Sequence, residues 1–312
     1  MASRGQRDME RFAGLARLAP PGWTIVEKDG VALGATPQDH ARLAGVGFDA
    51  TEDGALEYSE LAGRRPLQEL RVGGERLVVR RYHHGGLLRP LTGERFSDPT
   101  RPFREAGLAA RLEAAGIGTP RVVAARARPI GRGAWQLDLV TRRVEDAADV
   151  ESLLARASRG DLGRAALRAL VVAFGEAVGK MHAARFLHAD LTPKNALALE
   201  VERWLAQSPV GPPRLAFLDL DRSTFQDEPL TDDQRRDNLR RLHRYVARRD
   251  ARPPSLLSTA DRARFLRAAA PGTWREDWRS IAAQHERRAG AHRLGWWLEA
   301  KFGGNSGTGW RE

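Results

Sequence analysis

Cysteine is absent from the 312-residue sequence, which excludes disulfide bonds and thiolate metal sites and suits a reducing compartment. Long apolar runs are also absent. Charged residues interrupt residues 1–20, where a signal peptide needs an uncharged core, and no stretch reaches the roughly 18 apolar residues of a membrane-spanning helix. We therefore expect neither a targeting signal nor a membrane span.

Lysine is scarce, because arginine supplies nearly all of the basic residues. The only lysines are Lys28, Lys180, Lys194 and Lys301, although the formal net charge is +11. Such a charge favours anionic partners, among them nucleic acids, anionic lipid surfaces and acidic small molecules. An arginine-rich genome would produce the same composition, so the charge selects no partner by itself.

Hydrophobic patterns divide the chain into four parts. Residues 1–55 are predicted to form an N-terminal extension with one short strand at 23–27. Residues 56–143 have the alternation of a small antiparallel sheet with one inserted helix, residues 144–302 have helical patterns, and the Gly-rich tail at 303–312 is expected to be disordered. The predicted fold class is therefore α+β, with a sheet-rich N-lobe and a mainly helical C-lobe.

Turn and cap signals give the element boundaries. Strands are predicted at 67–72, 77–82, 119–125 and 135–141, and helices at 102–115, 149–156, 162–184 and 231–248. The first two strands flank the turn Gly73-Gly74, which is a hairpin signal. Thr231 and Gln234 have the spacing of a capping box and would open the last of these helices.

The functional interpretation depends on polar residues in the segment Phe186–Arg222. Asp190 is followed five residues later by Asn195, and His188 stands two residues before Asp190. Downstream, a short apolar run ends in Asp219. This order is the polar skeleton of a protein-kinase catalytic loop and its metal-binding strand. The ordered set, placed after a long predicted helix, predicts phosphoryl transfer.

Phosphoryl transfer needs a carboxylate that orients the acceptor, oxygen ligands for magnesium and a cation near the phosphates. Asp190 is predicted to orient the acceptor hydroxyl and take its proton. Asn195 and Asp219 offer oxygen ligands of the kind that Mg²⁺ prefers. His188 is predicted to brace the loop rather than react. Lys194 either contacts the transferring phosphate or faces solvent.

The predicted sheet should supply a phosphate-side cation and a carboxylate to pair with it. Strand alternation places Val78 and Arg80 on one face, so that Val78 would form the floor of the adenine site and Arg80 would reach the phosphates. Glu105, in the inserted helix, is the expected partner of Arg80, and Arg81 is the alternative one residue out of register. Gly63 opens a turn over the phosphates or forms an ordinary turn.

Other polar residues are expected to have structural rather than chemical roles. His83 and His84 have no companion ligands at metal spacing, and His182 is predicted to lie on a helix surface. Arginine pairs recur along the predicted helix at 231–248. They face solvent, or they face an anionic lipid or acceptor.

Further segments complete a pattern that is specific in combination. They are Arg80-Arg81-Tyr82-His83-His84-Gly85-Gly86-Leu87, Phe103-Arg104-Glu105 with Ala109-Arg111-Leu112, Ala115-Gly116-Ile117 leading to Pro120, His188-Ala189-Asp190-Leu191, and Leu218-Asp219-Leu220-Asp221-Arg222. Together they resemble the lipopolysaccharide core kinases, and among them the 3-deoxy-D-manno-octulosonic acid (Kdo) kinases. The resemblance runs from about residue 60 to residue 245. It departs in Thr192-Pro193-Lys194, which is more similar to the loop of general kinases.

The resemblance implies a bilobal protein-kinase-like fold that uses ATP and Mg²⁺ to phosphorylate a sugar hydroxyl on an anionic lipid A precursor. The sugar is inner-core Kdo, with heptose as the alternative. It implies a cytoplasmic enzyme, peripheral on the inner-membrane surface, with no nucleic-acid partner. By position, Asp190 would be the catalytic aspartate, Asn195 and Asp219 the metal ligands, and Arg80 with Glu105 the phosphate-side pair.

Two alternatives share many of these residues. Another small-molecule or protein kinase of the same fold would need the same catalytic set. A catalytically weak pseudokinase, or a basic RNA-associated scaffold, is favoured by the absence of lysine between residues 29 and 179. The joint presence of Asp190, Asn195 and Asp219 argues against a scaffold, which has no chemical need for the three together.

Overall fold

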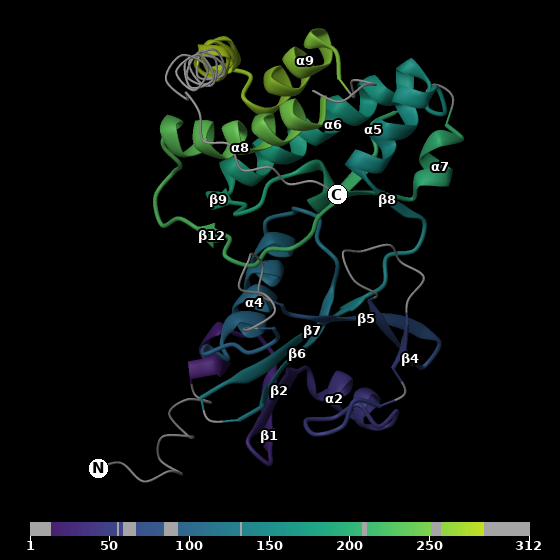
Figure 1. Cartoon of the computed structure of the whole chain (residues 1–312), viewed down its shortest axis with the longest axis vertical. Coiled ribbons are helices and arrows are strands. Elements are labelled where there is room, and N and C mark those ends of the chain that lie inside the picture. Colours follow the sequence, from purple (N-terminus) through teal and green to yellow (C-terminus); the bar gives the residue numbers. More distant parts are fainter. Residues whose placement is uncertain are drawn as a thin grey trace, which may run out of the picture.

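A computed structural model describes residues 14–54, 56–58, 67–83, 93–131, 133–207, 211–250 and 257–283. These residues form two lobes stacked along the long axis of the molecule (Figure 1). One lobe is built around an antiparallel sheet, and the other consists mainly of helices. The α+β fold with a sheet-rich N-lobe and a helical C-lobe is therefore confirmed.

The N-lobe sheet has seven antiparallel strands in the order β1-β2-β6-β7-β5-β4-β3. Their bounds are β1 Thr24–Lys28, β2 Val31–Ala35, β3 Glu57–Tyr58, β4 Gln68–Val72, β5 Glu75–Arg81, β6 Val122–Pro129 and β7 Trp135–Arg142. Gly73 and Gly74 have φ values of 55° and 82°, which gives the two-residue turn of the predicted hairpin. Strands β1 and β2, which fall within the predicted extension at 1–55, pair with β6 and belong to this sheet.

Helices cover both faces of the sheet. On one face, Phe103 of α4 (Arg101–Ala114) packs against Leu137 and Leu139. On the other face, Leu43 of α2 (Pro37–Ala44) packs in a cluster with Leu33 and Val79. Because side chains alternate along β5, its odd-numbered apolar residues face α2, and its even-numbered residues face α4 and the C-lobe.

The C-lobe is organised around α6, which supplies many of its buried apolar side chains. The helices are α5 Val150–Arg159, α6 Arg164–Ala183, α7 Val201–Leu205, α8 Asp232–Asp250 and α9 Thr259–Ala269, and the strands are β8 Ala147–Asp149, β9 Phe186–Leu187, β10 Ala196–Leu199, β11 Arg214–Phe217 and β12 Thr224–Phe225. The predicted capping box opens α8. The Gln234 backbone N–H donates to Thr231 Oγ1, and the Thr231 backbone N–H donates to Gln234 Oε1.

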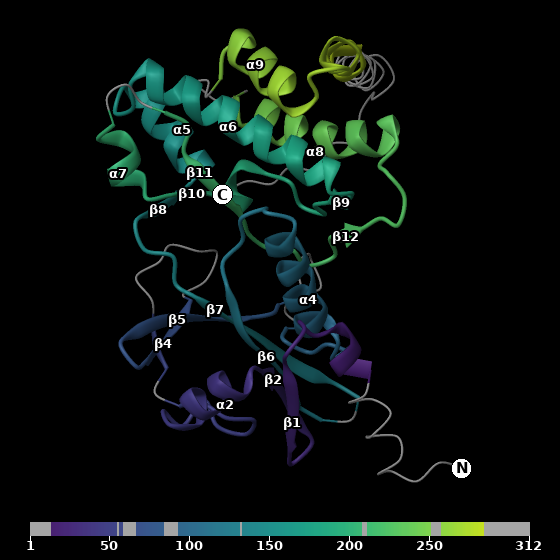
Figure 2. The same cartoon turned by 180° about the vertical axis from the view of Figure 1, so that it is seen from behind.

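The two lobes meet beside α4, whose C-terminal end reaches the small strands β9 and β12 (Figure 2). The chain after α4 bonds directly to the C-lobe, since the Phe217 N–H donates to the Gly118 carbonyl at 2.8 Å. This junction brings β5 and α4 close to the segments that contain Asp190 and Asp219.

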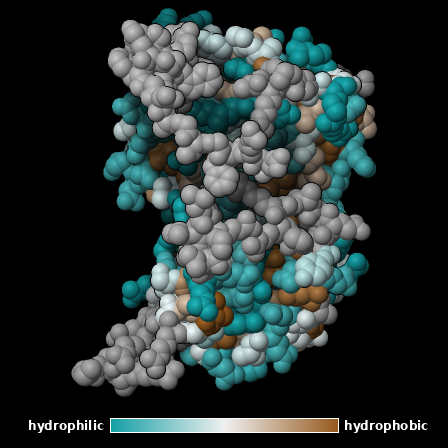
Figure 3. All heavy atoms as spheres, in the orientation of Figure 1, coloured by the Kyte–Doolittle hydropathy of each residue, from teal (hydrophilic) through white to brown (hydrophobic). Residues whose placement is uncertain are grey.

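The described surface is mostly hydrophilic on the face shown in Figure 3, with apolar residues in separate patches. Val26 and Tyr58 are the large apolar side chains that stand out as exposed among the described residues. No helix in the described ranges is long and apolar enough to cross a membrane.

Candidate active site

His188 joins the two segments that hold the predicted catalytic and metal-binding residues. Its imidazole is fully buried, and Nδ1 accepts the Asp190 backbone N–H at 3.1 Å. The opposite nitrogen, Nε2, therefore carries the proton and donates to the Leu218 carbonyl at 2.8 Å. Burial lowers the pKa of His188, which keeps the ring neutral. The ring is thus a brace between two backbones, as predicted from its position.

Asp190 and Asn195 form one unit within the loop after β9. Asn195 lies at the end of a single 3₁₀ turn, Pro193–Asn195. Its amide nitrogen donates to the Asp190 backbone carbonyl at 2.8 Å and to Asp190 Oδ2 at 3.1 Å. Both residues are solvent-accessible, and so is Lys194 between them. The loop therefore presents a carboxylate with a fixed orientation toward solvent.

Asp219 follows β11 in an uncommon backbone conformation. Its φ is 55°, in the left-handed region that non-glycine residues seldom adopt. The Leu218 N–H donates to the Asn195 carbonyl at 2.9 Å, so the chain is tied to the catalytic loop immediately before Asp219. Strained backbone held by its surroundings is a frequent feature of functional sites.

Arg80 reaches across the lobe junction from β5. Its guanidinium lies 2.5 Å from Glu105 Oε1 and 2.7 Å from Asp219 Oδ1. The Leu220 N–H donates to the same Glu105 oxygen at 3.1 Å. The structure therefore brings together Arg80 of β5, Glu105 of α4 and Asp219 after β11, which lie far apart in the sequence.

Tyr82 adds a hydroxyl to this group, which sequence reasoning missed. Its phenol donates to Glu105 Oε2 and lies 3.3 Å from the Arg80 guanidinium. Burial and the neighbouring Glu105 carboxylate raise the pKa of Tyr82 well above its usual range, so the phenol keeps its proton. Burial by itself would lower the pKa of Arg80. The negative charge of Glu105 and the other neighbours outweighs this effect, so the pKa lies above its usual value. Arg80 stays charged at all working pH values.

Arg80 and Arg81, the two alternatives for the phosphate-side cation, point to opposite faces of the sheet. Arg81 points to the other side of the sheet and donates to Asp138 at 2.9 Å. Val78 shares the face of Arg80 and is half-buried. Gly63 lies outside the described residues.

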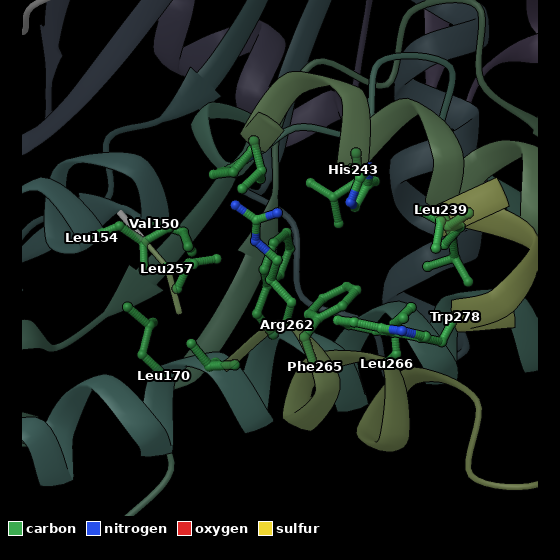
Figure 4. A pocket seen from close by; sticks show the side chains of 17 residues that line it. Val150, Leu154, Leu170, Leu239, His243, Leu257, Arg262, Phe265, Leu266 and Trp278 are labelled. Carbon is green, nitrogen blue, oxygen red and sulfur yellow. The ribbon is translucent and has the colours of Figure 1, made fainter. Parts of the chain in front are cut away.

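A pocket in the C-lobe has a different character (Figure 4). It is lined mostly by apolar side chains from α5, α6, α8 and α9, and its cavity volume is about 80 Å³. Ligand sites for molecules of nucleotide size usually measure about 300–1,000 Å³. This pocket is therefore a gap between packed helices, and the lobe junction remains the candidate active site.

Known proteins match the chain in this region. The sequence model of the lipopolysaccharide kinase (Kdo/WaaP) family matches residues 51–268, which is more than half of the chain. The chain belongs to the Kdo/WaaP family. The predicted resemblance to lipopolysaccharide core kinases is thereby confirmed.

Relatives in the family carry a common description. A 3-deoxy-D-manno-octulosonic acid kinase of Actinobacillus succinogenes is 29% identical over 140 residues, covering 44% of this chain and 55% of the relative. One from Photobacterium profundum is 33% identical over 132 residues, covering 40% and 52%. The chain spans about half the length of these curated relatives.

A solved structure supports the fold of this Kdo/WaaP-family chain. WaaP in complex with acyl carrier protein superposes with a TM-score of 0.53 and 26% identity, over 76% of this chain and 89% of WaaP. The bilobal protein-kinase-like architecture is therefore confirmed.

Several residues that support the site in this family member were not predicted. Asn238 of α8 is buried, and its amide donates to the His188 carbonyl at 2.8 Å while its oxygen pairs with His182 Nε2 at 3.1 Å. The prediction that His182 lies on a helix surface is wrong, because its side chain is buried against α8. Arg101 and Asp221 form a two-pronged ion pair between α4 and the segment after Asp219.

The residues fit a magnesium–nucleotide group. Within the described ranges, the side-chain hydrogen bonds of Asn195 use its amide nitrogen, and the side-chain hydrogen bond of Asp219 uses Oδ1. Oδ1 of Asn195 and Oδ2 of Asp219 are left for a hard cation. No cluster of three or more acidic or histidine ligands occurs in the described part of the chain. Mg²⁺ needs none, because it takes one or two protein oxygens together with phosphates and water.

Proposed function

We propose that this chain transfers the γ-phosphoryl group of ATP to a hydroxyl of a Kdo residue in the lipopolysaccharide inner core. The observation that carries the proposal is the meeting of Arg80, Glu105 and Asp219 next to a loop in which Asn195 orients Asp190. Membership of the Kdo/WaaP family and the description of its relatives as Kdo kinases support the choice of acceptor.

Asp190 is the proposed acceptor-orienting base. Its carboxylate accepts a hydrogen bond from the acceptor hydroxyl and takes the proton as the new oxygen–phosphorus bond forms. The bond between the γ-phosphorus and the bridging oxygen breaks, and ADP leaves with that oxygen. Asn195 holds Oδ2 of Asp190, which leaves Oδ1 for the acceptor. His188 keeps the loop in register with Asp219 throughout.

Arg80 is the proposed phosphate-side cation. Its guanidinium is already fixed by Glu105 and by the Asp219 carboxylate, and it retains its charge. An arginine with this support replaces the lysine that the sequence lacks, and Val78 forms the proposed floor beneath the base. Lys194, exposed beside Asn195, is proposed to contact the transferring phosphate. Gly63 remains a proposed part of the phosphate-covering turn.

Asn195 and Asp219 are the proposed magnesium ligands. When bound, Mg²⁺ neutralises charge that develops on the phosphate oxygens. The Asn195 carbonyl oxygen and one Asp219 oxygen would hold it from two segments that are bonded to each other through Leu218. The cation thus adds to the positive charge of Arg80.

The acceptor is proposed to be an anionic glycolipid of the Kdo-lipid A type. We propose that the chain works at the cytoplasmic surface of the inner membrane as a peripheral protein, where the net charge of +11 favours anionic lipids. Heptose in place of Kdo, and other small-molecule or protein acceptors, are the alternatives that an acceptor panel separates.

An acceptor panel tests the proposal. Purified chain with labelled ATP and Mg²⁺ is expected to label Kdo-bearing lipid A, and not a heptose-bearing analogue without Kdo or a general protein acceptor. Asp190→Ala is expected to lower the transfer rate by at least about a hundredfold, because a positioned base contributes that much or more. ATP affinity should stay close to that of the wild type.

Two outcomes would reverse these conclusions. Unchanged transfer by Asp190→Ala would remove the catalytic assignment. A wild-type chain that binds no Mg-ATP at millimolar concentration would instead be a pseudokinase or scaffold.

A further inference from the structure

The residue before the proposed base is held from both sides. The Ala189 N–H donates to Ser223 Oγ at 3.0 Å, and the Ala189 carbonyl accepts a hydrogen bond from the Arg241 guanidinium of α8. Arg241 is exposed, so the same guanidinium faces solvent next to Asp190. A cation therefore stands at the edge of the catalytic loop, on the C-lobe side.

Arg241 differs from the three arginines that precede it in α8. Arg235 pairs with Asp232, Arg236 pairs with Asp277 and Arg240 pairs with Asp237. Arg241 has only the Ala189 carbonyl as a partner among the residues that the structure describes. A guanidinium has five N–H donors, so most of its hydrogen-bonding capacity is left for another molecule.

A second arginine lies next to the residue that contacts the Ala189 N–H. Arg222 directly precedes Ser223, whose hydroxyl contacts the Ala189 N–H. Arg222 is exposed, has no ion pair with any described residue, and has a φ of 63°. The left-handed conformation is unfavourable for an arginine, and residues in it persist most often at functional positions. Arg241 and Arg222 therefore both belong to segments that contact Ala189, the residue before Asp190, and neither forms an ion pair with a residue that the structure describes.

The chemistry of the proposed acceptor gives these cations a use. An octulosonic acid carries a carboxylate, which an aldose such as heptose lacks. Planar guanidinium groups bind carboxylates through paired, charge-assisted hydrogen bonds. We propose that Arg241, together with Arg222, binds the carboxylate of the acceptor sugar and so selects sugar acids over neutral sugars at this site. This inference rests on the proposed sugar-kinase function.

The proposal predicts how the enzyme discriminates. A neutral sugar would leave the guanidinium groups without a counter-charge in a partly desolvated complex, whereas a sugar acid satisfies them. Charged hydrogen bonds contribute about 1.5–3 kcal/mol each, which corresponds to about tenfold to a hundredfold in kcat/KM.

The experiment compares two acceptors with four proteins. The acceptors are a lipid A precursor bearing one Kdo and the same molecule with its Kdo carboxylate converted to a methyl ester. The proteins are the wild type, Arg241→Gln, Arg222→Gln and the control Arg248→Gln. Arg248 is exposed on the same helix, two turns or about 10 Å along the helix axis beyond Arg241, and its substitution removes the same charge.

The wild type is expected to prefer the acid over the ester by about tenfold or more in kcat/KM. In Arg241→Gln and Arg222→Gln the ratio of kcat/KM for the acid to that for the ester should fall toward one, because the substitution lowers kcat/KM for the acid and leaves that for the ester unchanged. Arg248→Gln should keep the wild-type preference. ATP hydrolysis in the absence of acceptor should be the same in Arg248→Gln as in the wild type.

Other results overturn the proposal in distinguishable ways. Equal loss with acid and ester in Arg241→Gln would mean that Arg241 only supports the loop through Ala189. Equal use of acid and ester by the wild type would remove the carboxylate site and leave the kinase assignment intact. Phosphate transfer to neither acceptor would remove the proposed function, and the carboxylate site with it.

Discussion

At the scale of single residues, the site depends on neutral histidines in buried positions. His188 accepts the Asp190 N–H and donates to the Leu218 carbonyl, and a protonated ring could not do both. His182, which pairs with Asn238, is buried behind it. Burial lowers the pKa of both imidazoles relative to an unfolded chain.

These histidines predict a pH dependence of stability. Their folded-state pKa values lie below the unfolded value of about 6.5, so the unfolded chain binds more protons when the pH falls below that value. The free energy of unfolding is therefore expected to decrease as the pH drops below about 6.5, by at most about 1.4 kcal/mol per pH unit for each histidine. Denaturant titrations between pH 5 and pH 8 measure this slope.

His188→Gln isolates one contribution. The variant should be less stable at pH 8, because a flexible glutamine amide replaces the rigid imidazole that bridges the two backbone groups, and its stability should depend less on pH than that of the wild type. An unchanged slope would mean that His188 does not titrate in this range.

At the scale of elements, α4 is the part that assembles the site. Glu105 contacts Arg80 and the Leu220 N–H, and one turn earlier Arg101 forms an ion pair with Asp221. The Arg101 guanidinium also lies over the Phe96 ring at 4.7 Å. The helix is therefore attached to the segment around Asp219 at two points, and it carries Glu105 in the correct orientation.

A double-mutant cycle tests the Arg101–Asp221 pair. Arg101→Ala and Asp221→Ala are each expected to lower kcat/KM for ATP by about tenfold, since a partly buried two-pronged pair contributes on the order of 1–2 kcal/mol. The double variant should be no worse than either single variant, because both remove the same contact. Arg104→Ala, an exposed position in the same helix, is the control and should match the wild type. Losses that multiply in the double variant would show that the two residues act separately.

Local elements were predictable from the sequence, and distant contacts were less so. The hairpin of β4 and β5 and the start of α8 depend on neighbouring residues such as Gly73 and Thr231. The Arg80–Glu105 pair followed from strand alternation and from a kinase-like order of elements. Asn238 was missed as part of the site because it lies 50 residues after His188, and only tertiary packing brings α8 to the loop.

At the scale of the whole molecule, the N-terminal residues decide whether the N-lobe is complete. Strand β2 pairs with β6, with Ala35 opposite Ala124. The two strands lie far apart in the sequence, so no local pattern predicts this pairing. Leu33 of β2 is buried in the cluster that includes Val79 of β5, the strand that carries Arg80. Residues within 14–54 thus contribute to the core beneath the proposed nucleotide site.

Leu33→Ala tests this contribution. Removing a buried leucine side chain is expected to destabilise the N-lobe by about 2–5 kcal/mol, and heat inactivation of phosphate transfer should occur at a lower temperature. Val26→Ala in β1 is the control, because that side chain is 44% exposed and its loss should change the inactivation temperature little. If residues 1–55 were instead a separate extension, Leu33→Ala would leave the heat inactivation of the kinase unchanged. The physical reason for the expected difference is that β5 shares one apolar core with β2, so a cavity beside Leu33 loosens the strand that positions Arg80.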